Sequence, residues 1–142
     1  MKHVILTGLL VSALGFTAAS TFAQENANHT VLGSVTLTRK VLADGQPLAA
    51  GTYQVRLSPD QVKPVVGESP DAERYVEFVR AGKVAGREVA TVISSSDMAT
   101  MGKYGKPPTN SSKVETLKGG DYLRVWINRG SNNYLIHFPT AA

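Results

Sequence analysis

Apolar and polar residues alternate with a period of two through most of this chain, and that alternation restricts its fold more than any other feature. It is clearest over residues 122–128, where Leu123, Val125 and Ile127 fall on one face of an extended strand. An amphipathic helix would instead repeat its apolar residues every three or four positions. The pattern therefore indicates half-buried β-strands.

Similar segments recur between clusters of glycine, proline, asparagine and aspartate, which favour turns. The strands that this pattern predicts cover residues 31–41, 48–57, 74–80, 83–94, 113–118, 122–128 and 134–138. Six or seven strands without a predicted helix indicate an all-β fold, either a single antiparallel β-sandwich or a small barrel. Residues 24–142 are enough for one hydrophobic core, so we expect a single β-rich domain.

Segment 72–80 is the ambiguous part of this pattern. Its apolar residues also fit helical spacing, and Ser69-Pro70-Asp71 resembles a helix start. The run Tyr-Val-Glu-Phe-Val favours a strand, however, and Ala81-Gly82-Lys83 favours a hairpin turn. We therefore predict that residues 74–80 pair with residues 83–94. Gly86 would then mark a bulge or a site of close approach to the backbone.

The first 23 residues have the layout of a secretory signal peptide. Lys2 supplies a positive charge, residues 4–16 are mainly apolar, and the small residues Thr21 and Ala23 precede a cleavage site before Gln24. A retained membrane anchor is the alternative, but the apolar stretch is short for a bilayer that needs about 20 residues. We expect cleavage, export to the periplasm or beyond, and no stable membrane span afterwards.

Cysteine is absent from the sequence, which excludes disulfides, zinc–cysteine sites, thiol nucleophiles and a lipid-bearing cysteine. An exported domain of this composition has to be stable by packing alone. The formal net charge is +4, and the lysines and arginines are scattered along the chain. That distribution does not predict a nucleic-acid partner.

Few residues of catalytic type follow the leader. A serine hydrolase would need His137 beside the run Ser94–Asp97, yet no G-x-S-x-G motif surrounds those serines, and such a run is typical of a turn or cap. Glu77 and Glu88 could pair across the predicted hairpin, but arginines 80 and 87 in the same hairpin favour a surface ion-pair ladder. We predict no catalytic residue, metal or cofactor; a small periplasmic hydrolase is the alternative.

Aromatic residues form a candidate binding surface near the C-terminus. Tyr122 and Trp126 share a strand face with Arg124 between them, and Tyr134 could join them across the next hairpin. An exposed face of this kind would stack on sugars or ligand rings, whereas a buried one would belong to the core.

The stretch 97–112 is rich in glycine, proline, serine and asparagine, and it is the least structured interior segment predicted. Within it, Lys103, Tyr104 and Lys106 could contact anionic lipid or polysaccharide. The alternative is that these lysines only keep a loop solvated.

Residues 47–57 read P-L-x-x-G-T-Y-x-V-x-L, which resembles the entry strand of small exported β-sandwich proteins of bacteria. Val76-x-Phe78 with Gly82-Lys83-Val84 is similar to the hairpin that follows it there. The resemblance implies a fold and an exported location, and no particular activity. The expected function is therefore that of a non-catalytic β-domain of the cell envelope that binds a ligand, a glycan or a protein partner.

Overall fold

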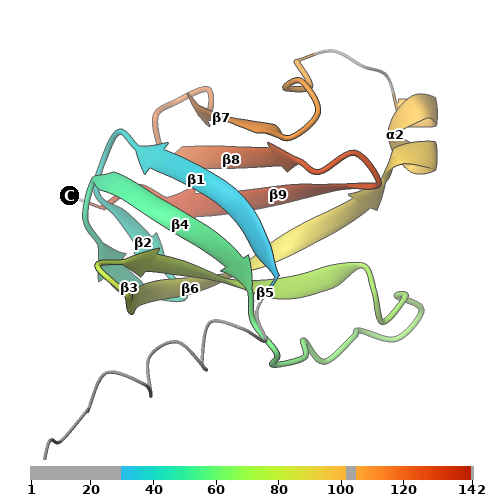
Figure 1. Cartoon of the computed structure of the whole chain (residues 1–142), viewed down its shortest axis with the longest axis horizontal. Coiled ribbons are helices and arrows are strands. Elements are labelled where there is room, and N and C mark those ends of the chain that lie inside the picture. The colour runs from blue at the N-terminus through green and yellow to red at the C-terminus, as the bar shows by residue number, and fades with distance from the viewer. Residues whose placement is uncertain (1–29, 102–104, 142) are drawn as a thin grey trace, which may run out of the picture.

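The computed structural model describes residues 30–101 and 105–141 (Figure 1). The predicted signal peptide, Lys103 and Tyr104 lie outside the described residues. The described elements are β1 (Val31–Leu37), β2 (Val41–Ala43), β3 (Gln46–Leu48), β4 (Gly51–Leu57), β5 (Glu73–Arg80), β6 (Lys83–Ser94), α2 (Ser95–Met101), β7 (Ser111–Thr116), β8 (Tyr122–Asn128) and β9 (Asn132–Pro139).

Seven of these strands form one antiparallel sheet in the order β1-β4-β5-β6-β9-β8-β7. The sheet curls until its first and last strands adjoin, so that it is nearly closed into a barrel (Figure 1). At the seam the Ser112 hydroxyl donates a hydrogen bond to the backbone oxygen of Ser34, at 3.3 Å. The predicted all-β, antiparallel fold is confirmed, and of the two architectures expected it is the small barrel.

The ambiguous segment is a strand, and its pairing with the next strand is the predicted one. β5 and β6 form a hairpin in which Val76 and Phe78 point into the barrel and are fully buried. Phe78 packs edge-on against Tyr53 and Phe138, with ring centroids 6.1 and 5.2 Å away. Burial of these alternating side chains outweighs the weaker helical spacing of the same segment.

The small β2–β3 hairpin covers one end of the barrel (Figure 1). Its apolar residues Val41, Ala43 and Leu48 are at most 2% exposed. Gly86 lies beneath them: a Cβ at this position would be 3.1 Å from Leu48 Cδ1 and 3.3 Å from the Ala43 Cβ. The β5–β6 ladder skips Ala85, so the predicted bulge lies next to Gly86, and the close approach at Gly86 is made by the Leu48 and Ala43 side chains. We call this hairpin the plug.

Several predicted boundaries were wrong. The strand expected over residues 48–57 begins at Gly51, and Leu48 lies in β3 instead. The strand expected over residues 31–41 ends at Leu37, and the chain resumes as β2 in the plug, because residues 38–40 turn away from the sheet. The stretch expected to be irregular begins with the helix α2. Its first turn is stabilised locally, since the Ser94 hydroxyl accepts a hydrogen bond from the backbone N–H of Asp97.

Candidate functional site

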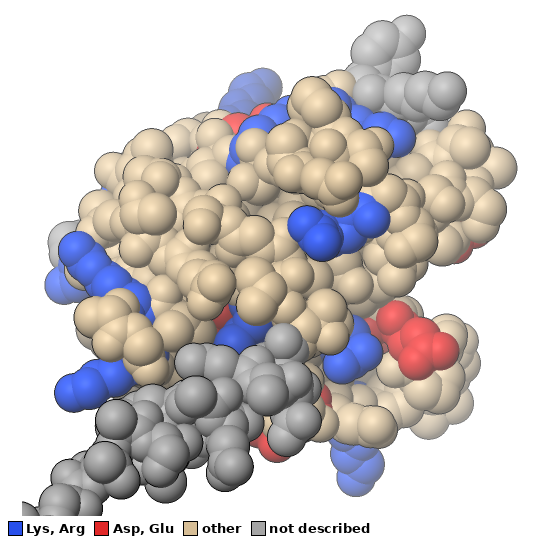
Figure 2. All heavy atoms as spheres, in the orientation of Figure 1, with Lys and Arg blue, Asp and Glu red and all other residues tan. Residues whose placement is uncertain are grey.

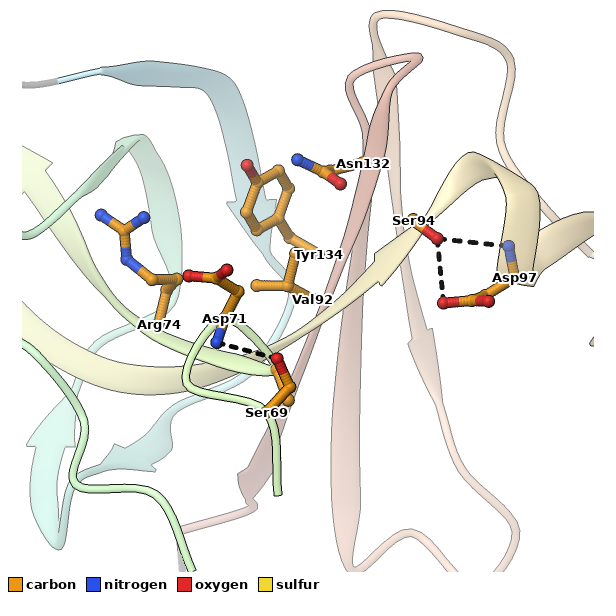
Figure 3. A pocket seen from close by; sticks show the side chains of 9 residues that line it. Ser69, Asp71, Arg74, Val92, Ser94, Asp97, Asn132 and Tyr134 are labelled. Carbon is orange, nitrogen blue, oxygen red and sulfur yellow. Dashed lines mark hydrogen bonds between the residues drawn. The ribbon is translucent and has the colours of Figure 1, made fainter. Parts of the chain in front are cut away.

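The barrel end opposite the plug holds a pocket of about 520 Å³ (Figure 3). Five of its lining side chains point to the inward face of the sheet. Along β6 and β9 they occupy every second position from the buried Ala90 and Ile136, and the fifth, on β5, lies opposite Ala90. These five are Arg74, Val92, Ser94, Asn132 and Tyr134. The loop before β5 adds Ser69, Asp71 and Ala72, and α2 adds Asp97. We call this site the mouth pocket.

Polar groups dominate the mouth pocket, and several have no partner within the protein. Among the described residues, the Arg74 guanidinium, the Asp71 carboxylate, the Asn132 amide and the Tyr134 hydroxyl make no hydrogen bond or ion pair of 4.0 Å or less. In Figure 3 the Arg74, Asp71, Asn132 and Tyr134 side chains lie around one space, while Ser94 and Asp97 lie to one side. The free groups are thus available to a ligand.

Ser94 and Asp97, by contrast, are engaged with each other. The Ser94 hydroxyl donates to the Asp97 carboxylate at 2.9 Å and accepts from the Asp97 backbone N–H at 3.2 Å (Figure 3). This reciprocal pair caps the start of α2. The serine run before an acid therefore acts as a helix cap.

His137 lies too far from this pair to act on it. It faces outward on β9, opposite Arg124, whereas Ser94 pairs with Asn132 on the inward face. Five residues of strand separate Asn132 from His137, a distance of about 16 Å along β9. Partial burial, and then the charge of Arg124, lower the pKa of His137. The structure does not bring together the serine, acid and histidine of the predicted alternative.

The two glutamates considered as a catalytic pair are also apart. Glu77 is opposite Arg87 and Glu88 is opposite Val76, so their side chains leave opposite faces of the sheet. Glu77 accepts a hydrogen bond from Arg56 at 2.9 Å, and Glu88 accepts one from the backbone N–H of Asp44 at 2.8 Å.

Arg80 and Arg87 do not form the predicted ion-pair ladder with the glutamates of the hairpin. Arg87 pairs with Asp60 at 2.9 Å and stacks on Tyr75 at 4.2 Å from the ring centroid. Arg80 lies 5.6 Å from the centre of the Tyr53 ring. These contacts are structural, and they leave no carboxylate pair within the hairpin.

The predicted aromatic platform is divided between two faces of the sheet. Tyr122, Arg124 and Trp126 share the outward face, but Tyr134 is opposite Ile127 and points inward. Trp126 is only 6% exposed, because the Lys113 and Arg124 cations lie over its ring at 5.3 and 5.7 Å from the centroid. Its indole N–H donates to Asn133 at 2.9 Å. Of the three aromatic residues, Tyr122 is exposed and Tyr134 reaches the mouth pocket.

Of the predicted loop candidates, the structure describes only Lys106, which is exposed. The neighbouring Pro107 is buried, and its carbonyl accepts a hydrogen bond from the Asn128 amide at 2.8 Å. The described part of this loop is thus anchored to the end of β8. Lysine and arginine side chains are dispersed among uncharged residues on the face seen in Figure 2.

The sequence pattern did not identify Arg74, Asp71 and Asn132 as site residues. A usable signal was present for two of them, since Arg74 continues the inward positions of Val76 and Phe78, and Asn132 continues those of Tyr134. A polar residue that prolongs an apolar strand face marks the place where that face leaves the core. Asp71 lies in a loop and had no such signal.

Within the described residues, no group of three or more histidine, cysteine, aspartate or glutamate side chains could hold a metal ion. No helix in residues 30–101 and 105–141 has the length and apolar character needed to span a bilayer. Models of known protein families, curated proteins and solved structures were each compared with the chain, and none of them matches it.

Proposed function

We propose that the chain is an exported, non-catalytic binding domain and that the mouth pocket is its ligand site. One observation carries the proposal: the barrel is filled by the plug at one end and opens at the other into a pocket lined by free polar side chains. Pockets for small ligands commonly have volumes of about 300–1,000 Å³, and this one falls in that range.

The free groups also have an energetic reason to bind. A polar group in a recess is satisfied only by water or by a ligand, and a ligand that matches its hydrogen bonds releases ordered water. Arg74 comes from β5, and Asn132 and Tyr134 come from β9 of the same sheet, so their positions are fixed before binding. Preorganisation of this kind lowers the entropic cost of binding.

A non-catalytic role is supported by the separation of His137 from Ser94 and by the engagement of Asp97 in the cap. The hydrolase alternative has no observation in its favour within the described residues. Export is supported by the leader pattern of residues 1–23 and by the resemblance of residues 47–57 to exported β-sandwich proteins.

The binding role is tested by mapping a mixed set of small fragments onto the protein by two-dimensional NMR. The set contains sugars, amino acids, organic acids and aromatic compounds. We expect amide shifts to converge on residues 69–74, 92–97 and 132–134. Asn132→Ala should weaken the response at least about threefold, because it removes a donor and an acceptor from the pocket. Tyr122→Ala, on the outward face, is the control and should leave the response unchanged. Shifts that avoid the mouth pocket would refute the assignment.

Export is tested separately by expressing the full chain in a bacterium that secretes proteins. We expect the protein in the periplasmic fraction or the medium, with an N-terminus at Gln24 by mass spectrometry. Protein retained in the cytoplasm with residues 1–23 intact would contradict the exported location.

A further inference from the structure

Arg74 differs from the other arginines of the barrel strands. Each of the other four has a partner within the protein: Arg56 with Glu77, Arg80 with Tyr53, Arg87 with Asp60, and Arg124 with Glu115. Arg74 has none among the described residues, although it occupies an inward strand position opposite the buried Ala90. Arg74 is half-buried at the open end of the barrel, so its guanidinium is left to donate its hydrogen bonds to water or to a ligand.

Two carboxylates share the pocket with this guanidinium. Asp71 comes from the loop before β5 and makes no side-chain hydrogen bond to a described residue, whereas Asp97 binds Ser94. Asp71 and Arg74 both line the pocket, and Figure 3 shows them on the same side of it. With Asp71 and Asp97, the pocket carries two negative charges against the one positive charge of Arg74. An anionic ligand would gain from Arg74 but be repelled by both carboxylates.

Hydroxyl groups satisfy this arrangement best. Asp71 only accepts hydrogen bonds and Arg74 only donates them, while a hydroxyl does both and can bind either neighbour. The remaining polar lining, Ser69, Asn132 and Tyr134, is itself able to donate and accept. An apolar ligand would strip water from all these groups and return no hydrogen bond.

An α-amino acid would bind only the two charged residues, Asp71 and Arg74. Its ammonium could bind Asp71 and its carboxylate Arg74, which leaves the amide and hydroxyl groups of the rest of the wall without partners. Several hydroxyls on one rigid ring match the whole lining instead.

Resting on the proposed function, we infer that the mouth pocket binds a neutral saccharide, with adjacent hydroxyls held by Asp71 and Arg74. The ligand class is thus an uncharged, polyhydroxylated ring. The two charged residues would recognise it by hydrogen bonds to its hydroxyl groups.

The test compares matched sugars that differ by one carboxylate. Methyl glucoside, galactoside and mannoside are titrated into the full chain beside the corresponding methyl uronides, with alanine as the amino-acid probe. Binding is followed by NMR shifts of residues 69–74 and 132–134. We expect at least one neutral glycoside to bind about 10-fold more tightly than its uronide, which is the effect of one unfavourable charge contact.

Two variants separate the roles of the charged residues. Asp71→Asn should weaken the neutral glycoside about 10-fold and reduce the discrimination against the uronide, because the repulsion is removed with the charge. Arg74→Gln should weaken both sugars. Asp60→Asn is the matched control: Asp60 pairs with Arg87 outside the pocket, so sugar binding should not change.

The outcomes distinguish this inference from the proposed function. Tighter binding of the uronide, or binding of alanine without any glycoside, would overturn the saccharide assignment and leave the pocket as the ligand site. If no glycoside binds while other fragments shift the pocket residues, the ligand class is wrong. If neither the glycosides nor the mixed fragments reach the pocket, both conclusions fail.

Discussion

Glu115 links two cations across the outward face of the barrel. It accepts hydrogen bonds from the Arg124 guanidinium and lies 3.4 Å from the Lys113 ammonium, and both cations lie over the Trp126 ring. Burial acts to raise the pKa of this carboxyl, but the hydrogen bond and charge of Arg124, together with Lys113, hold it below the usual value. The charges that cover Trp126 are thus held in place by one carboxylate.

Substitution of Glu115 should make the free energy of unfolding less dependent on pH in the acidic range. Because its pKa is lower in the folded state, its contribution is complete above the unfolded pKa of about 4.3 and is lost as the pH falls through the folded value. We expect Glu115→Gln to lower the free energy of unfolding by about 0.5–1 kcal/mol at pH 7, the range of partly exposed ion pairs. Urea unfolding at pH 7 and pH 3 measures this.

At pH 3 the difference between Glu115→Gln and the natural protein should shrink toward zero. Glu73→Gln is the control, since Glu73 makes no ion pair with the described residues. A difference that stays constant over this pH range would show that the ion pairs of Glu115 do not stabilise the fold.

At the scale of elements, the plug packs against the barrel at Gly86, where the lack of a Cβ leaves room for it. The β2–β3 hairpin has only three residues in each strand, so contacts with the barrel have to hold it in place. Leu48 and Ala43 reach the β6 backbone where a Cβ would leave too little room.

Gly86→Val should displace the plug and lower the free energy of unfolding by about 1–3 kcal/mol, the usual cost of overpacking. Ala85→Val tests the adjacent, exposed residue of the bulge and should change stability by no more than about 0.5 kcal/mol. Both values come from urea unfolding monitored by Trp126 fluorescence. Equal effects of the two substitutions would mean that the close approach at Gly86 is not what holds the hairpin.

Alternation predicted the main strands because inward and outward environments follow it directly, as Leu123, Val125 and Ile127 show. The helix α2 was missed because seven residues carry little periodic signal and its cap depends on a single serine. The site was harder to predict. That Arg74, Asn132 and Tyr134 adjoin follows from the pairing of β5 with β6 and of β6 with β9, and the register of β6 with β9 is not encoded locally.

At the scale of the whole molecule, the sheet closes without a continuous hydrogen-bonded ring. β1 and β7 adjoin, but the described residues make no backbone ladder between them, and only the Ser112 side chain bridges to Ser34. Each strand edge is thereby shielded by the other, which reduces the risk of pairing with a second chain.

The filled end and the open end of the barrel also separate two kinds of sequence constraint. Residues around the plug, such as Val41 and Phe138, are fully buried and carry the cooperative core. Residues at the mouth, such as Asp71 and Asn132, contribute no buried hydrogen bond within the described protein. Substitutions at the mouth should therefore cost little stability, so under the proposed function the same barrel can be engineered toward other ligands without redesign of its core.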